Sequence, residues 1–127
     1  MRLVSSQEVI EFHDRLISRD GGIPGMTEPG RADALIHRVL NMHHDDGVTD
    51  IYDLAAVYLV AIVRGHIFND ANKRTALLVA HVFLKRNGVQ IMSPRISFDE
   101  MQIIAVNAAT GEYTWKRVSD HLKAIIL

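Results

Sequence analysis

Apolar residues recur every three or four positions along most of this chain, which is the period of amphipathic helices. Residues 5–8 (Ser-Ser-Gln-Glu) fit a capping box, the pattern that satisfies the first backbone N–H groups of a helix. A helix that begins there carries the following residues on one face: Val9, His13, Leu16 and Ile17. We therefore predict a first helix that begins at this box.

Residues 20–30 interrupt the helical pattern. Four glycines and two prolines fall within this stretch, and no helix survives that density of breakers. The segment is predicted to be a flexible surface loop or a short hairpin of unusual length, and long loops often carry function. A second helix follows, with Leu35, Val39 and Met42 on one face and Ile36 and Leu40 beside them. Gly47 is predicted to end it.

Residues 54–63 are apolar on nearly all sides, which is typical of a helix in the middle of a fold. Thr49 and Asp50 are both candidate N-caps for it. A fourth helix is predicted over 75–86, with Asn87-Gly88 as its stop. Three further features complete the pattern: a short extended piece at 89–91, a capping box at 97–100 for a helix ending at 110–111, and a last helix from Thr114. The fold class predicted is all-α, a single compact bundle of about six helices.

Composition narrows the function classes. The 127 residues fit one domain, 1–127, without a linker. The formal net charge is −1, so no global basic field exists to bind nucleic acid directly. The chain has no cysteine, which excludes disulfides and thiolate zinc sites. Since neither a targeting signal nor a membrane-spanning run is found, we expect a cytoplasmic protein that does not engage a membrane.

The candidate chemistry lies in the polar segment 64–74, between the two most apolar helices. Loops at the ends of rigid, buried helices are good positions for reacting groups. His66 offers an imidazole, which titrates near neutral pH and can take a proton from an attacking hydroxyl. Asp70 offers a hard oxygen ligand for Mg²⁺. These residue types suit phosphoryl chemistry.

The same segment carries groups suited to binding phosphate. Ala71 has almost no side chain, so backbone N–H groups there can approach an anion closely. Lys73 and Arg74 fall in the first turn of the fourth helix, where the helix dipole disfavours cations by roughly 0.3–1 kcal/mol each. A bound polyphosphate would compensate for this unfavourable placement. The alternative is that both are solvated surface cations.

Other polar groups have simpler interpretations. We interpret four histidines as hydrogen-bonded structural residues: His13, His37, His81 and His121. Residues 43–46 (His-His-Asp-Asp) resemble a metal cluster at first sight, but sequence neighbours diverge around a helix, so a solvated helix end is favoured. Phe68 is expected to be a buried anchor of the loop.

Residues 66–74 read His-Ile-Phe-Asn-Asp-Ala-Asn-Lys-Arg. This segment resembles the signature of the Fic family, His-x-Phe-x-(Asp/Glu)-(Gly/Ala)-Asn-(Gly/Lys)-Arg, and more closely its Doc (death on curing) branch. The likeness extends over nearly the whole chain: Doc-like chains are similarly short and all-helical, with similar sequences at 21–25, 29–31, 64–65 and 86–89.

The resemblance implies a role for each residue of the motif. His66 would be the general base and Asp70 the Mg²⁺ ligand. The remaining implied roles are an anion-binding turn of Ala71, Asn72 and Lys73, a phosphate contact by Arg74, and an anchor in Phe68. The loop 21–30 matches the flap with which Fic proteins position a target segment.

Lys73 stands where most Fic proteins have a second glycine. Most Fic proteins transfer AMP to a hydroxyl, but a bulky cation here would prevent the nucleotide from lying in that way. In the Doc branch the implication is reversed ATP binding with the γ-phosphate facing His66. The chain would then be a kinase toxin that modifies a threonine of elongation factor Tu and arrests translation.

Many Fic proteins carry an inhibitory pattern, (Ser/Thr)-x-x-x-Glu-(Gly/Asn), which is absent from this sequence. The resemblance therefore implies restraint by a Phd-like antitoxin whose C-terminal segment folds into a groove. Two alternatives remain open: a Fic-type AMP transferase, and a catalytically silent partner-binding module. A metal-dependent hydrolase is less favoured, because two ligands do not close a metal site.

Overall fold

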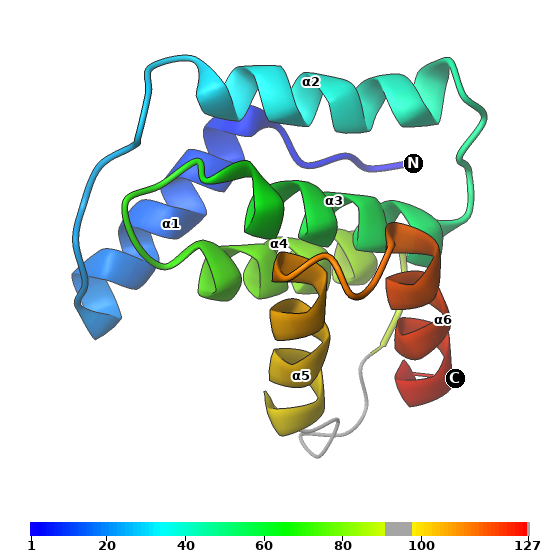
Figure 1. Cartoon of the computed structure of the whole chain (residues 1–127). Helices are drawn as coiled ribbons and strands as arrows, with labels where there is room; N and C mark the ends of the chain where they lie inside the picture. Colours follow the sequence, from blue (N-terminus) through cyan, green and yellow to red (C-terminus); the bar gives the residue numbers. More distant parts are fainter. Residues whose placement is uncertain (91–97, 127) are drawn as a thin grey trace.

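The computed structural model describes residues 1–90 and 98–126, and within them the regular structure is helical (Figure 1). The six helices are α1 (Ser6–Asp20), α2 (Arg31–His44), α3 (Ile51–Gly65), α4 (Asn72–Arg86), α5 (Phe98–Ala109) and α6 (Trp115–Ile126). The prediction of an all-α fold with about six helices is therefore confirmed over the described residues.

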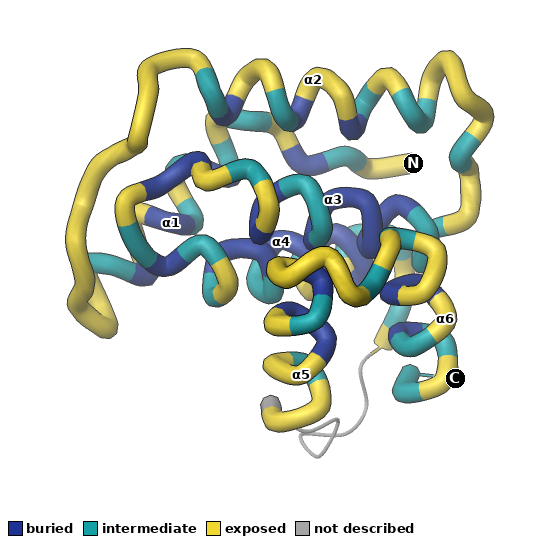
Figure 2. Tube along the Cα trace, viewed as in Figure 1, coloured by how far each residue is buried: buried dark blue, intermediate teal, exposed yellow. Residues whose placement is uncertain are grey.

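Helix α3 lies at the centre, as its apolar sequence predicts. It packs against α2, α4, α5 and α6, and α1 closes the remaining side through α2 and α4. Figure 2 shows α3 and the facing side of α4 as the most continuously buried parts of the chain. Leu54, Leu59 and Ile62 of α3 have no exposed surface. Each fully buried side chain of this size contributes roughly 1.5–3 kcal/mol, so this helix is a rigid base for the loop that follows it.

Most of the local capping signals are found where the sequence places them. Ser5 caps α1 and forms the predicted reciprocal box with Glu8. Of the two candidate caps for α3, Asp50 is the one used, since its carboxylate accepts from the N–H groups of Tyr52 and Asp53. Helix α4 ends in the Schellman pattern, with Gly88 at φ +87° and the Val89 N–H bonded to the Leu84 carbonyl.

One predicted boundary is wrong. Helix α4 begins at Asn72, three residues before the predicted Thr75, because a polar first turn carries no apolar period to reveal it. The last helical residue of α2 is His44, and Gly47 stops the helix as predicted: it is left-handed at φ 73°, and the Val48 N–H after it donates to the Met42 carbonyl at 3.1 Å. The buried residues of α2 are Ala32, Ile36 and Val39, so the centre of the buried face lies one residue along from the predicted one: Val39 and its predicted neighbour Ile36 are buried, and Leu35 and Met42 are partly exposed. The predictions at 89–91 and 97–100 reach residues outside those that the structure describes.

The N-terminal segment is fixed to the core by one phenol. The Tyr58 hydroxyl accepts from the Val4 N–H at 2.9 Å and donates to the Val4 carbonyl at 2.8 Å. Both residues are fully buried. Burial raises the pKa of Tyr58 to about 12, so the hydroxyl keeps its proton and its donor function at neutral pH.

Replacing Tyr58 by Phe is expected to lower the free energy of unfolding by roughly 1–3 kcal/mol, because the Val4 N–H and carbonyl are left buried without a partner. Chemical denaturation of Tyr58→Phe beside the native chain measures this difference. Tyr52→Phe, altered on a partly exposed ring of the same helix, is the matched control. Equal midpoints for Tyr58→Phe and the native chain would contradict the assigned role.

Within the described residues, none of the helices combines the length and the apolar character required to cross a bilayer.

Candidate functional site

The loop 66–71 joins the end of α3 to the start of α4 and holds an unusual backbone. His66 has φ 48° and Ala71 has φ 64°, and these are the two non-glycine residues with positive φ among those described. The left-handed conformation costs roughly 1–2 kcal/mol for such residues. Strained backbone persists where its surroundings over-determine it, and it gathers at functional sites.

The side chains of Phe68 and Asn72 fix the conformation of this loop. Phe68 lies in the core with 2% of its surface exposed. The Asn72 amide accepts from the Phe68 N–H at 3.1 Å and donates to the Phe68 carbonyl at 2.9 Å. The Asn72 side chain is therefore committed to the shape of the loop, and what this residue can offer an anion is its backbone N–H.

Asp70 presents a carboxylate that is held by backbone donors. Its Oδ1 accepts from the Ala71 N–H at 2.8 Å, and its Oδ2 accepts from the Ile23 N–H at 3.0 Å. The hydrogen bond from Ile23 and then that from Ala71 lower the pKa of Asp70, and the nearby Arg74 adds to the effect. Asp70 is thus ionised at neutral pH.

Such a carboxylate fits a hard divalent cation. No group of three or more His, Cys, Asp or Glu side chains able to hold a metal gathers within 1–90 and 98–126. A cation at Asp70 would therefore need oxygen ligands from a phosphate and from water, which is how Mg²⁺ usually binds beside nucleotides.

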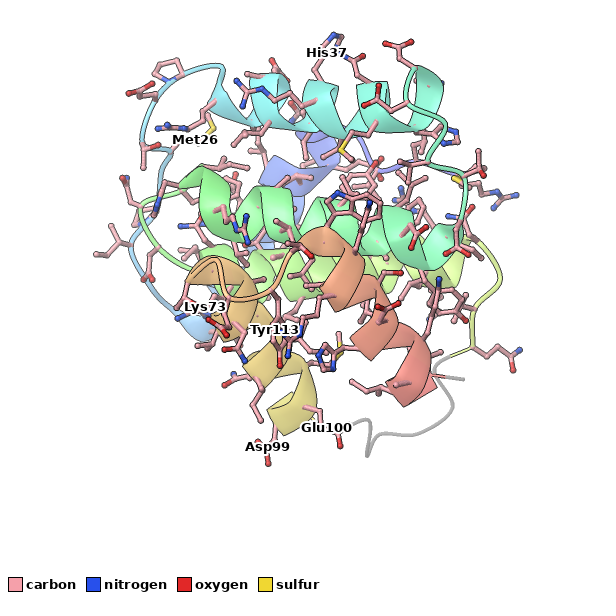
Figure 3. All side chains as sticks on the ribbon, turned by 45° about the vertical axis from the view of Figure 1, so that its right-hand side comes forward. Met26, His37, Lys73, Asp99, Glu100 and Tyr113 are labelled. Carbon is pink, nitrogen blue, oxygen red and sulfur yellow. The ribbon has the colours of Figure 1, made fainter. Side chains whose placement is uncertain are left out.

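The start of α4 faces the same site. Its first turn has no side-chain cap in the described structure, and its N-cap residue is Ala71. The first N–H groups of a helix carry a partial positive charge and attract anions. Lys73 is exposed in this turn, at the end of the molecule that also holds Met26 (Figure 3). Arg74 reaches towards the Gly21 carbonyl, at 3.4–3.5 Å from its two terminal nitrogens.

Residues 21–30 form an exposed loop that is bonded to the loop 66–71, and the two lie together at one end of the molecule (Figure 1). The Thr27 N–H donates to the Ile67 carbonyl at 2.9 Å, and the Asn69 N–H donates to the Gly25 carbonyl at 3.1 Å. Met26 and Phe68 form an isolated antiparallel bridge. The segment is therefore neither a free loop nor a full hairpin, but a flap with one short pairing.

Gly22 of this flap lies beside Asp70, directly before the Ile23 N–H that donates to the carboxylate. A Cβ there would lie 2.8 Å from Asp70 Oδ2 and 3.3 Å from Arg74 Nη2, and its φ of +130° is strained for any other residue. Gly22→Ala should push the flap away and weaken the bond from Ile23 to Asp70.

We expect Gly22→Ala to lower the rate of any reaction at this site by about 10-fold, in the range that small misplacements of reacting groups cost. Thermal unfolding should change little, since the flap is exposed. Gly21→Ala is the control, because no atom lies within 4 Å of a Cβ at Gly21 although its φ is also positive. Steady-state kinetics of the two variants make the comparison, and equal losses would contradict the close approach as the cause.

His13 of α1 also reaches this site, although no sequence pattern predicts it there. Its ring is fully buried and stacks on Phe68, with centroids 3.7 Å apart and planes 3° from parallel. Its Nε2 lies 3.0 Å from the Asp70 carbonyl oxygen. His13 is hydrogen-bonded, as predicted, but the group that it bonds, the Asp70 carbonyl, belongs to the candidate site.

The other singled-out histidines lie apart from this loop. His37 projects from the outer side of α2 (Figure 3), and His121 stacks on Tyr113, with centroids 4.6 Å apart. Burial lowers the pKa of His81. In the segment 43–46, His43 Nδ1 is bonded to the Val48 carbonyl at 2.8 Å, so this ring serves the end of α2.

This chain is similar to known proteins along most of its length. The model of the Fic/DOC family matches residues 3–84. A protein of Escherichia phage P1 named "Protein kinase doc" is 51% identical over 126 residues, covering 98% of this chain and 96% of the relative. A protein of Mycolicibacterium smegmatis named "Toxin Doc" is 36% identical over 72 residues, covering 56% of this chain and 55% of that relative.

Proposed function

The chain belongs to the Fic/DOC family, and on this premise we propose that it is a Doc-type toxin that acts as a protein kinase. The phosphoryl group comes from ATP, and the acceptor is a threonine hydroxyl of elongation factor Tu. Its modification arrests translation in the cytoplasm. The similarity to the phage P1 kinase covers 98% of the chain, which supports one functional unit over 1–127.

The proposal is carried by one observation: the single strained loop 66–71 carries His66 at its start, the ionised Asp70 near its end, and leads directly into the uncapped start of α4. His66 stands at one end of the loop and Ala71 at the other, each in the left-handed conformation. Phosphoryl transfer makes little demand on the protein beyond positioning and neutralisation of charge. A chain of this size can supply both.

The reaction assigns a distinct task to each residue. His66 takes the proton from the threonine hydroxyl as its oxygen bonds to the γ-phosphorus of ATP. The bond from that phosphorus to the bridging oxygen breaks, and ADP leaves with the electron pair. Lys73, Arg74 and the first N–H groups of α4 hold the phosphate charge.

Asp70 is the residue that would hold Mg²⁺. The bound cation would neutralise phosphate charge as it builds on the leaving group. The ionised state of Asp70 supports this assignment, as do its two backbone donors, which fix the carboxylate without using all of its lone pairs.

Lys73 supports phosphoryl transfer over transfer of AMP. It occupies the second position of α4, in the turn whose N–H groups would cradle an anion. A lysine side chain there occupies space beside these N–H groups that a glycine would leave open to the nucleotide. Its positive charge also attracts the terminal phosphates of ATP. The γ-phosphate is then the group presented to His66.

Restraint of this activity is proposed to come from a Phd-like antitoxin whose disordered C-terminal segment folds on binding. The sequence lacks the inhibitory helix pattern found in many Fic proteins, and the two relatives described above are named as a protein kinase and as a toxin. No direct contact with nucleic acid is proposed, given the net charge of −1.

Labelled ATP tests which phosphorus atom of the nucleotide is transferred to the acceptor. Elongation factor Tu is incubated with this protein, Mg²⁺ and ATP labelled at either the γ- or the α-phosphorus. The proposal predicts label on elongation factor Tu from γ-labelled ATP alone. Label from α-labelled ATP would establish AMP transfer instead, and label from neither would remove elongation factor Tu as the acceptor.

A further inference from the structure

The contacts of His13 lead beyond the residues of the motif. His13 lies on α1, and its Nε2 is 3.0 Å from the carbonyl oxygen of Asp70, 57 positions away in the sequence. A carbonyl oxygen only accepts hydrogen bonds, so Nε2 carries a proton and donates it to this bond. The other nitrogen, Nδ1, lies 3.1 Å from the Asp14 carboxylate.

The carbonyl that His13 holds belongs to the peptide group between Asp70 and Ala71. In a trans peptide the carbonyl and the N–H point in opposite directions. The N–H of the same group is that of Ala71, and it donates to Asp70 Oδ1 at 2.8 Å. His13 therefore donates to the carbonyl of this planar peptide group, and the N–H on the opposite edge of the same group orients the Asp70 carboxylate.

The same plane determines the start of α4. Ala71, which contributes the N–H of this peptide group, is the N-cap of α4 and has the left-handed conformation, at φ 64° and ψ 25°. Rotation of the plane would relieve the strain at Ala71, but it would break the bond from His13 and leave a polar atom buried without a partner. It would also turn the Ala71 N–H away from Asp70 and shift the first N–H groups of α4.

We infer that His13 is a positioning residue for the reaction, which holds the Asp70–Ala71 peptide plane in the orientation that the site requires. The expected effect of His13 on the reaction rate rests on the proposed function. Its expected effect on the orientation of the peptide plane rests on the geometry alone. His13 touches no reacting atom, since its ring is fully buried beneath the loop and stacked on Phe68.

Two substitutions separate the two contacts of the ring. His13→Phe keeps an aromatic ring that can stack on Phe68 but has no N–H to donate. His13→Gln loses the ring but carries an amide N–H at about the reach of Nε2. Should His13→Phe not fold, His13→Met takes its place as a donor-free side chain that fills irregular core space. Tyr58→Phe is the control for lost stability, because it removes buried hydrogen bonds away from the site.

Turnover of elongation factor Tu is measured for the full chain at saturating ATP and Mg²⁺. We expect His13→Phe to lose roughly 10- to 100-fold in kcat, the cost of a small misplacement at a reacting centre. We expect KM for the acceptor to stay near the native value and His13→Gln to keep most of the native kcat. Equal losses of kcat in His13→Phe and His13→Gln would overturn the inference. A Tyr58→Phe chain that loses as much kcat as His13→Phe for the same fall in Tm would also overturn it, because lost stability would then explain the effect.

A second readout is independent of the reaction. The amide resonance of Ala71 in a ¹H–¹⁵N spectrum reports its hydrogen bond to Asp70. It should move in His13→Phe and stay close to the native position in His13→Gln. If the native chain does not modify elongation factor Tu, the proposed function fails, and this resonance still decides the role of His13: an unchanged position in His13→Phe overturns it.

Discussion

Removal of the His66 imidazole is expected to lower phosphoryl transfer by roughly 100- to 10,000-fold, the usual contribution of a general base. The side chain is exposed, so its loss creates no cavity and the fold should persist. The backbone at His66 is left-handed, at φ 48°. His66→Asn is therefore a better variant than His66→Ala, because asparagine tolerates this conformation and cannot act as the base.

The measurement is the single-turnover rate of phosphoryl transfer to elongation factor Tu, with circular dichroism as the check on folding. His37→Ala provides the matched control, since this histidine is also exposed but lies on the outer side of α2 (Figure 3). A folded His66→Asn chain with the native rate would exclude His66 as the base.

Loss of the Asp70 charge is the second large effect. Asp70→Asn nearly preserves the shape of the side chain, but it removes the charge that would bind Mg²⁺ and weakens one of the two bonds from Ile23 and Ala71. We expect a fall in rate of about 100-fold or more, since a bound cation contributes several kcal/mol to stabilisation of charge.

A magnesium titration distinguishes this role from simple loss of loop structure. The Asp70→Asn chain should need a much higher Mg²⁺ concentration for half-maximal rate, whereas a general disturbance of the loop would lower the rate at every concentration without moving the midpoint. Asp46→Asn, an exposed acidic residue after α2, is the control. An unmoved midpoint in Asp70→Asn would mean that Asp70 is not the metal ligand.

Much of the fold follows from patterns that are local in sequence. The capping box at Ser5, the all-round apolar run of α3 and the Asn87-Gly88 stop each depend on residues within one or two turns of one another. The start of α4 was placed too late, because Asn72, Lys73 and Arg74 are polar. They lie in the helix although no apolar period marks them.

The candidate site was predicted as a segment but not as a structure. The motif at 66–74 predicts which groups react. The bond from Ile23 to Asp70, however, comes from a backbone N–H, which any non-proline residue at that position would offer. The contact of His13 is hidden for the same reason, since its partner is a carbonyl group distant in sequence. Such contacts depend on tertiary packing, which no spacing of residue types encodes.

The most direct test of the central claim is the intact mass of elongation factor Tu after incubation with this protein, ATP and Mg²⁺, with His66→Asn as the parallel sample. Phosphoryl transfer from a nucleotide held at α4 predicts a gain of one phosphoryl group with the native chain and no gain with the variant. A gain of one adenylyl group would contradict the interpretation of Lys73, and a phosphoryl gain that persists in His66→Asn would contradict the role of His66.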